Sequence, residues 1–250
     1  MNKPPIISLE NVSKSFGSTQ VLKEINLTVS EGECAVVMGG SGSGKSVLIK
    51  HLVGLLRPDS GAVTVLGKRV DQILGDELDR LRLSIGYLFQ SGALFDSMTV
   101  EENLLFFLER HKNLSTDEAQ EKIEQTLDWV GLPEKRHQFP AELSGGQKKR
   151  IALARAIILE PKIVLYDEPT TGLDPVSVRM VADLIVRLRE ERGITSVAIT
   201  HDLLCAEIIS DSVHFLQDGA FVTSGSLEEI SQYNDPAIAT FFGTELSQLS

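Results

Sequence analysis

The chain of 250 residues contains little cysteine and no long apolar run. Its two cysteines, Cys34 and Cys205, lie far apart within separate apolar stretches, which excludes a disulfide framework and a cysteine-based metal site. We expect both to be buried thiols. No apolar stretch reaches the roughly 18 to 20 residues that a membrane span requires, and the segment before Leu9 lacks the apolar core of a signal peptide. We therefore expect a soluble, cytosolic chain.

Basic residues are also under-represented, with 24 Lys and Arg against 35 Asp and Glu and a net charge of −11. A dedicated nucleic-acid binder usually carries a basic stripe, so we expect no nucleic-acid partner. Nucleotides remain possible ligands, because a local glycine loop can hold phosphate groups. Hydrophobic residues make up 42% of the chain, an ordinary share that is sufficient for a sizeable core.

Short apolar runs separated by helical stretches predict an α/β fold with a mainly parallel sheet. The opening section differs, because its apolar and polar residues alternate, which predicts antiparallel strands beside the core sheet. The antiparallel strands are expected at residues 6–16, 21–29 and 62–66. The core strands are expected at residues 34–38, 85–89, 163–166, 196–199 and 213–216, with a hairpin turn at Asp218-Gly219 after the last.

Between the strand at 85–89 and the strand at 163–166 the pattern becomes helical. Helices are expected at residues 45–53, 100–109, 115–130 and 144–159, and Ser115 and Glu118 form a capping-box pattern. We interpret the whole chain, residues 1–250, as one domain. Its core comprises residues 1–90 and 161–230, its inserted helical subdomain 91–160 and its C-terminal tail 231–250. Helix is expected from Leu227 onward, with a frayed end.

A phosphate-binding loop is predicted between the strand at 34–38 and the helix that follows it. The pattern is Gly, four residues, then Gly-Lys-Ser. Glycines let backbone N–H groups turn toward phosphate, Lys45 neutralises the β and γ oxygens, and the Ser46 hydroxyl binds Mg²⁺. The predicted ATP-binding residues of this loop are Gly39, Gly40, Ser41, Gly42, Ser43, Gly44, Lys45, Ser46 and Val47.

The apolar strand at 163–166 is followed by two adjacent carboxylates, Asp167 and Glu168. Side chains at the carboxyl end of such a strand point into the crevice where ligands bind. We expect Asp167 to hold Mg²⁺ and Glu168 to polarise the attacking water. Acids after a strand often merely cap the next element, so this interpretation depends on the phosphate loop.

A second candidate anion site opens the helix at 144–159. Its residues are Leu143, Ser144, Gly145, Gly146 and Gln147. A helix N-terminus attracts anions, yet the chain already has one phosphate loop, so two chains are expected to share each nucleotide. Taken alone, the pentapeptide is equally compatible with a glycine-rich helix cap that binds no ligand.

Together these three motifs resemble those of the nucleotide-binding subunits of ABC (ATP-binding cassette) transporters, over about residues 6–230. Residues 39–46 resemble the Walker A motif, 163–168 Walker B and 143–147 the family signature. The resemblance implies the ABC ATPase fold, built on a P-loop NTPase core. It also implies hydrolysis of ATP with Mg²⁺ in a head-to-tail homodimer, in which each signature faces the γ-phosphate bound by the other chain.

The resemblance assigns further roles. Gln90 matches the Q-loop residue that touches Mg²⁺, His201 the switch histidine at the γ-phosphate and Asp174 the D-loop. Phe16 lies where the family places an aromatic that stacks on adenine, and Val21 would line the other side of the base. Alternatives remain: Gln90 as a solvated strand end, His201 as a helix start or core histidine, and Phe16 as a buried strand-end side chain. The catalytic set is Glu168, His201, Lys45 and Gln90; the Mg²⁺ set is Ser46, Gln90 and Asp167.

Membrane partners follow only from the resemblance. The family docks permease subunits beside the Q-loop, here near residues 91–108, on the cytoplasmic side of a bacterial inner membrane. A helix cap followed by a core-facing helix is the alternative for this segment. Residues 91–95 and 234–243 resemble the ATPases of Mce/Mla-type phospholipid transporters, which implies lipid cargo and an Mce-domain partner. Other cargo, such as polar amino acids, lipoproteins or a drug, and a non-transport role are the alternatives.

Overall fold

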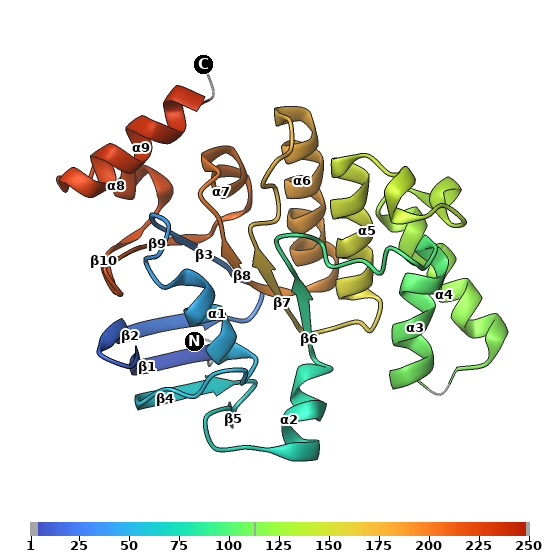
Figure 1. The fold of residues 1–250 in the computed structure, drawn as a ribbon, viewed down its shortest axis with the longest axis horizontal. Helices are drawn as coiled ribbons and strands as arrows, with labels where there is room; N and C mark the ends of the chain where they lie inside the picture. Colours follow the sequence, from blue (N-terminus) through green and yellow to red (C-terminus); the bar gives the residue numbers. More distant parts are fainter. Residues whose placement is uncertain (1–4, 113, 249–250) are drawn as a thin grey trace.

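The computed structural model describes residues 5–112 and 114–248, which form two sheets. The larger has the strand order β10-β9-β3-β8-β7-β6, in which all neighbours are parallel except β10, which is antiparallel to β9. The smaller sheet, β2-β1-β4-β5, is antiparallel throughout. Figure 1 shows the smaller sheet beside α1, with α5, α6 and α7 across the larger sheet.

The strands of the smaller sheet are β1 (Pro5–Phe16), β2 (Thr19–Ser30), β4 (Ser60–Val65) and β5 (Lys68–Arg69). Those of the larger sheet are β3 (Cys34–Met38), β6 (Ile85–Leu88), β7 (Ile163–Asp167), β8 (Thr195–Ile199), β9 (Ser212–Gln217) and β10 (Ala220–Gly225). The helices are α1 (Lys45–Leu52), α2 (Gly75–Arg82), α3 (Val100–His111), α4 (Thr116–Trp129), α5 (Gly145–Ile157), α6 (Pro175–Arg192), α7 (Leu203–Ile209), α8 (Leu227–Ser231) and α9 (Pro236–Gln248). Short 3-10 helices occur at Pro133–Lys135 and Pro140–Glu142.

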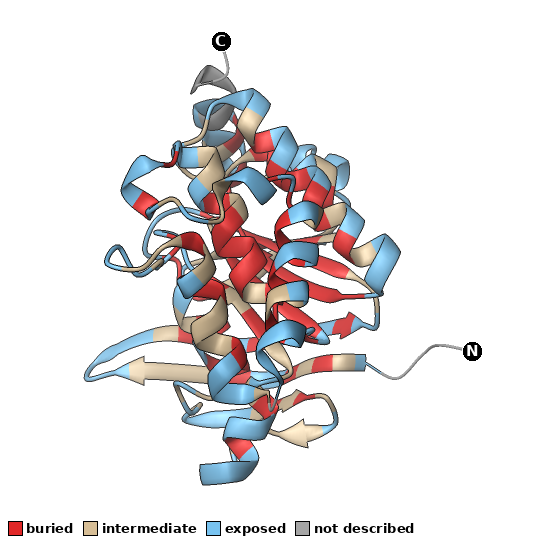
Figure 2. Ribbon diagram, turned by 90° about the vertical axis from the view of Figure 1, so that its right-hand side faces the viewer, coloured by how far each residue is buried: buried red, intermediate tan, exposed pale blue. Residues whose placement is uncertain are grey.

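Strand β3 is buried on both of its faces. Cys34, Val36 and Met38 pack in the apolar cluster shared with the helices α3 to α7. Ala35 and Val37 alternate with them and pack in the cluster that α1 shares with the antiparallel sheet. This double coverage explains why the strand is apolar at every position, and Figure 2 shows buried residues running through the centre of the molecule.

The predicted α/β class, parallel core and antiparallel flank are confirmed, with the predicted strand and helix ends within about two residues of those observed. Both cysteines are buried free thiols, also as predicted. Ser115 and Ser144 cap α4 and α5 in capping boxes. The division into core, inserted helical subdomain and tail stays a prediction.

The tail from Leu227 is helical, as predicted, but it is divided into two helices. The tail forms α8 and then α9, and Asp235 accepts hydrogen bonds from the N–H groups of Ala237 and Ile238 at the start of the second helix. Proline at position 236 suits the first turn of a helix and not its interior, so the chain breaks before it. The expected frayed end falls on residues 249–250, outside the described residues.

Within the described ranges, no helix combines the length and the apolar character needed to cross a membrane.

Candidate functional site

A cavity of about 690 Å³ opens beside the carboxyl ends of β3, β7 and β8. It is lined by most of the residues predicted to bind phosphate or act in catalysis. These are Val21, Gly39, Gly40, Ser41, Gly42, Gly44, Lys45, Ser46, Val47, Gln90, Asp167, Glu168 and His201. Segments separated by more than 150 residues in the sequence therefore meet around one space.

The phosphate loop depends on glycine at both of its ends. Gly39 has a φ of 146°, and a Cβ there would collide with the carbonyl oxygen of Leu216 on β9. Gly44 has a φ of 109° and directly precedes α1, where a Cβ would lie 2.9 Å from Leu22 Cδ2 and from the Val21 carbonyl oxygen. Any other residue at these positions would be strained and would push the loop away from the strands behind it.

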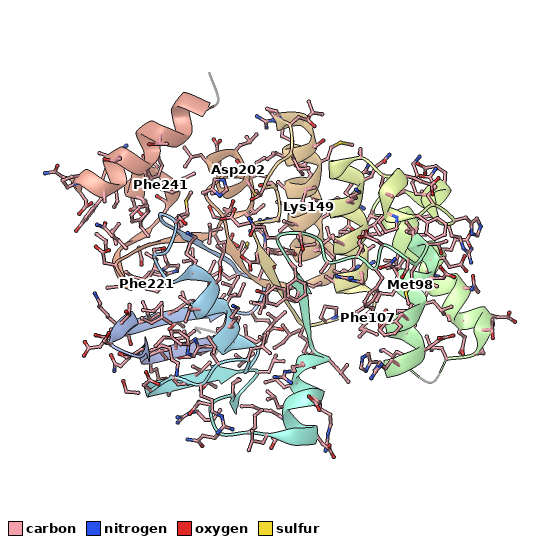
Figure 3. The ribbon with its side chains drawn as sticks, in the orientation of Figure 1. Met98, Phe107, Lys149, Asp202, Phe221 and Phe241 are labelled. Atoms are coloured by element: carbon pink, nitrogen blue, oxygen red, sulfur yellow. The ribbon has the colours of Figure 1, made fainter. Side chains whose placement is uncertain are left out.

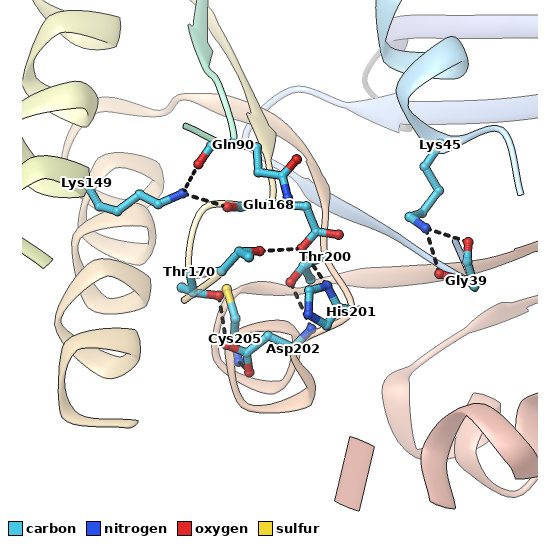
Figure 4. A network of polar contacts seen from close by, with 12 residues as sticks. Gly39, Lys45, Gln90, Lys149, Glu168, Thr170, Thr200, His201, Asp202 and Cys205 are labelled. Atoms are coloured by element: carbon cyan, nitrogen blue, oxygen red, sulfur yellow. Dashed lines mark hydrogen bonds and ion pairs between the residues drawn. The ribbon is translucent and has the colours of Figure 1, made fainter. Parts of the chain in front are cut away.

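Lys45, the first residue of α1, extends over the loop that precedes it. Its Nζ donates hydrogen bonds to the carbonyl oxygens of Gly39, at 2.7 Å, and Gly40, at 2.9 Å (Figure 4). Burial lowers the pKa of Lys45, whereas the nearby carboxylates of Glu168 and Asp167 raise it. The ammonium group lies in the cavity among groups that suit a bound phosphate.

Asp167 ends β7 and is half-buried in the cavity wall. Burial raises its pKa, the hydrogen bond from Tyr87 lowers it, and the charge of Glu168 raises it; the net shift is upward. The Tyr87 hydroxyl donates to Asp167 Oδ2 at 3.2 Å. Sequence reasoning did not single out Tyr87, whose strand β6 lies beside β7 in the sheet.

Glu168 is held by two neighbours. Its Oε2 lies 2.8 Å from His201 Nδ1 and accepts a hydrogen bond from Thr171 Oγ1 at 3.0 Å. Burial raises the pKa of Glu168, but the His201 and Thr171 contacts and the charge of Lys45 together lower it below its usual value. The carboxylate is thus kept ionised although its side chain is only 12% exposed.

The backbone at Glu168 has a φ of 53°, a left-handed conformation that residues other than glycine seldom adopt. Such strain persists where the surroundings fix the residue, and it concentrates at functional sites. Its N–H donates to the Ile199 carbonyl oxygen of β8 at 2.9 Å. The chain therefore turns sharply at the carboxylate that the sequence singled out as the water-polarising base.

The donors in the cavity fit a Mg²⁺ ion that arrives with nucleotide. Asp167 offers a carboxylate, Ser46 a hydroxyl and Gln90 an amide oxygen. Among the described residues, no group of three or more His, Cys, Asp or Glu side chains could hold a metal alone. Mg²⁺ is usually bound by one or two carboxylates together with waters and substrate phosphates, so a donor set this sparse suits it.

The signature residues do not line this cavity. Ser144 Oγ accepts a hydrogen bond from the N–H of Gln147 at 3.3 Å, and Gln147 Oε1 accepts from the N–H of Ser144 at 2.9 Å. Leu143 is buried before the helix starts, while Ser144 and Gly145 are exposed. The helix-cap geometry is present, and the glycine-rich start of α5 lies outside the cavity that the chain's own phosphate loop lines.

Phe16 and Asp174 also lie outside the cavity. The Phe16 side chain is 47% exposed, with Lys14 Nζ 5.6 Å from its ring centroid, which rules out the alternative of a buried strand-end side chain. Asp174 caps α6 by accepting hydrogen bonds from the N–H groups of Val176 and Ser177, each at 3.0 Å. Neither residue contributes to this cavity within one chain.

Two further lining residues come from the C-terminal helix α9. Phe241 and Thr244 complete the cavity beside the phosphate loop, and Figure 3 shows Phe241 projecting from α9 toward the sheet. The Phe241 ring packs edge-on against Phe215 of β9, with centroids 5.3 Å apart. No sequence pattern places a helix some 200 residues later against a phosphate loop, so this contact could be found only in the structure.

A family model described as "ABC transporter" matches residues 22–171. The probable ribonucleotide transport ATP-binding protein mkl of Mycobacterium tuberculosis is 37% identical over 235 residues. That alignment covers 94% of this chain and 66% of mkl, so the chain spans slightly less than two thirds of that protein.

The arginine transport ATP-binding protein ArtM of Bacillus subtilis is 42% identical over 224 residues, covering 90% of this chain and 92% of ArtM. The chloroplastic protein trigalactosyldiacylglycerol 3 of Arabidopsis thaliana is 38% identical over 252 residues, covering 94% of this chain and 73% of that protein. Among solved structures, the dimeric ATP-binding cassette MJ0796 in a post-hydrolysis state with ADP and Pi has a TM-score of 0.81. It is 33% identical, and the match covers 88% of this chain and 98% of that one.

The family model spans more than half of the chain, two of these relatives are named as ATP-binding proteins, and the solved ATP-binding cassette shares the fold. The chain therefore belongs to the ATP-binding domains of ABC transporters and has the ABC ATPase fold.

Proposed function

We propose that this subunit hydrolyses ATP in the cavity around residues 39–47 and uses the cycle to drive a separate membrane permease that moves phospholipid. The observation that supports the proposal most strongly is the meeting of Lys45, Asp167, Glu168 and His201 in one space. They come from three separate segments of the chain, with Asp167 and Glu168 adjacent on one of them, and together they supply a cation, a metal ligand, a base and its holder.

Phosphoryl transfer to water needs positioning and charge stabilisation more than covalent chemistry. Lys45 neutralises the β and γ oxygens of ATP. Ser46, Asp167 and Gln90 would hold Mg²⁺, which would supply positive charge to offset that of the phosphate groups. Glu168, kept ionised, accepts a hydrogen bond from the attacking water. His201 holds one oxygen of that carboxylate, and the same histidine side chain contacts the γ-phosphate.

The second half of each site comes from a second copy of this chain. The start of α5 carries partial positive charge and two exposed small residues, Ser144 and Gly145, yet it lies away from its own phosphate loop. Residues 143–147 of one chain face the γ-phosphate held by the other chain. Asp174 acts as the D-loop residue at the contact between the two chains. Phe16, whose side chain is half-exposed, stacks on the adenine ring.

The permease docks in an apolar groove of about 650 Å³ between α2, β6, α3 and α5. Phe89 and Leu83 are exposed there, and Phe107, Arg80 and Arg82 also line the groove. Phe89, which lines the groove, directly precedes Gln90 in the chain. A permease segment bound in the groove would therefore lie next to the Q-loop.

Only part of the expected docking segment, residues 91–108, lines this groove. Phe107 does so, whereas Val100, Leu104 and Leu108 of α3 are buried and Thr99 caps the helix, as the alternative for this segment held. The remaining walls come mainly from α2, β6 and α5. Docking therefore uses a surface wider than the segment that the sequence indicated.

Phospholipid cargo is the most specific part of the proposal. It is supported by residues 91–95 and 234–243, which resemble those of Mce/Mla-type ATPases, and by a relative named after a galactolipid. Such a system adds an Mce-domain partner and places this chain on the cytoplasmic side of a bacterial inner membrane. Arginine or another polar solute is the second candidate, because ArtM shares 42% identity.

The test uses tagged Glu168→Gln, which we expect to bind ATP without turning it over and so to hold the complex together. The variant is expressed in the native host, extracted from membranes in mild detergent with ATP, and its partners and lipids are identified by mass spectrometry. Glu190→Gln, an exposed carboxylate on α6, is the control that should keep wild-type turnover.

Recovery of a permease, an Mce-domain protein and phospholipid supports the full proposal. A permease with a solute-binding protein instead would keep the ATPase and replace the cargo, while recovery of soluble proteins alone would contradict a transport role. Wild-type turnover in Glu168→Gln would exclude Glu168 as the base.

A further inference from the structure

Lys149 is a buried cation on α5 that none of the motifs above assigns. Its side chain is 7% exposed, although it lies only five residues after Ser144 at the start of the helix. A buried ammonium is costly unless its donors are satisfied, so its partners indicate what it does.

The Lys149 ammonium joins two separate parts of the nucleotide site. Its Nζ donates hydrogen bonds to the carbonyl oxygen of Gln90 at 2.5 Å and to that of Glu168 at 2.9 Å. Figure 4 shows the side chain reaching from α5 to the point where these two backbones pass each other. Gln90 and Glu168 both line the cavity, and both of their carbonyl oxygens accept a hydrogen bond from Lys149 Nζ.

At Glu168 this contact fixes a strained turn. The residue has a left-handed φ of 53°, and its N–H is bound to the Ile199 carbonyl oxygen on β8. With its carbonyl oxygen bound by Lys149, both of the peptide groups that flank Glu168 are anchored. The direction of the carboxylate follows from the direction of this backbone, because a side chain leaves Cα at a fixed angle.

At Gln90 a second cation on α5 extends the attachment. Arg155 donates from Nη2 to the Gly92 carbonyl oxygen at 2.8 Å and from Nη1 to that of Ala93. Arg155 is also 7% exposed. The segment that follows β6 is thus bound to α5 at three carbonyl groups, of which the one at Gln90 is the nearest to the cavity.

We propose that Lys149 is a positioning residue for ATP hydrolysis, whose ammonium holds the backbone at Gln90 and Glu168 in place relative to α5. Lys149 does not line the cavity, so it acts through those two residues. The inference rests on the proposed roles of Glu168 and Gln90. Because α5 begins with the signature, a shift of that helix would be transmitted to both residues through this one side chain.

The test compares Lys149→Met, which keeps the length of the side chain and removes its donors, with Lys149→Arg, which keeps both charge and donors. Lys148→Met is the matched control, since Lys148 is the exposed neighbour on the same helix. For each variant, kcat for ATP and the Kd of a fluorescent ATP analogue are measured, with the midpoint of thermal unfolding.

We expect Lys149→Met to lower kcat about 10- to 100-fold, the range that a small misplacement of reacting groups causes, while the Kd changes less than about threefold. Lys149→Arg should recover most of kcat, and Lys148→Met should match the wild type. Wild-type kcat in Lys149→Met, or equal losses of kcat and binding without recovery in Lys149→Arg, would overturn the proposal.

If Lys149→Met does not fold, Lys149→Gln is measured against the same criteria, because its shorter, uncharged side chain lacks the ammonium group that binds both carbonyl oxygens. Glu168→Gln is assayed in parallel. Turnover in Glu168→Gln would defeat the proposed base, whereas loss of turnover in Glu168→Gln with wild-type kcat in Lys149→Met would defeat only the positioning role.

Discussion

Lys45 and Glu168 carry opposite charges on facing walls of one cavity, and each is held by neighbours that fit its charge. The ammonium of Lys45 is bound by two carbonyl groups of its own loop. The carboxylate of Glu168 is bound by His201 and Thr171. Both groups are therefore positioned before nucleotide arrives, which is the arrangement that electrostatic catalysis requires.

Lys45→Ala is expected to reduce ATP turnover by about 100-fold or more, because no other lysine or arginine among the described residues lines this cavity. Steady-state ATPase rates measure the effect. Lys68→Ala is the control, since that lysine forms only an exposed ion pair with Glu77. A Lys45→Ala rate near that of the wild type would contradict the phosphate-loop assignment.

Thr171→Val is expected to move the acid limb of the pH–rate profile to higher pH. The Thr171 hydroxyl donates to the ionised form of Glu168 and helps to lower its pKa, so its loss raises that pKa and protonates the base earlier as the pH falls. The profile of kcat against pH measures the shift. An acid limb that stays at the same pH would show that protonation of Glu168 does not limit turnover at low pH.

At the scale of elements, Asn103 organises the loop that leads into α3. It is fully buried, and its amide oxygen accepts a hydrogen bond from the N–H of Phe95. Its amide nitrogen donates to the carbonyl oxygens of Phe95, Met98 and Thr99. The side chain thus replaces the ladder of hydrogen bonds that this irregular segment lacks.

Asn103→Ala is expected to lower the free energy of unfolding by about 2–4 kcal/mol, because several buried backbone groups lose their partner at once. Urea unfolding followed by circular dichroism measures it. Asn234→Ala, at an exposed asparagine, should change stability by less than about 0.5 kcal/mol. Equal effects of the two substitutions would exclude the structural role of Asn103.

The sequence was sufficient to predict the strands of the core, because residues buried on both faces, as in β3, form continuous apolar runs. It did not reveal α2, whose eight residues include only two buried side chains, Leu78 and Leu81. The break between α8 and α9 was also missed, although Pro236 marks it. Sparse burial and local hydrogen bonds determine such elements, and neither leaves a long periodic pattern.

For the site, the predictable residues were those with a chemical role in a short motif, such as Lys45, Asp167 and Glu168. Residues that support them were missed, because their role depends on contacts between distant segments. Lys149 binds carbonyl groups 59 and 19 residues away, and Tyr87 binds a carboxylate 80 residues away. A lone lysine or tyrosine gives no sign of this in the sequence.

At the scale of the whole molecule, three surfaces are set apart by the fold. The nucleotide cavity lies at the carboxyl ends of the parallel strands, the signature lies at the exposed start of α5, and the apolar groove lies between α2, β6 and α3. Since the signature lies outside its own cavity, the proposed mechanism takes residues 143–147 from a second copy of the chain to complete each site. The solved relative MJ0796 is a dimer.

The most direct test mixes two inactive variants. Lys45→Ala removes the phosphate-loop cation, and Ser144→Asp keeps a good helix cap while its charge opposes the γ-phosphate. Each variant alone should lose turnover. In a mixed dimer, both changes fall in the same shared site and leave the other site intact, so an equal mixture should recover about one quarter of the wild-type turnover. A mixture as inactive as its components would contradict the sharing of each ATP between two chains.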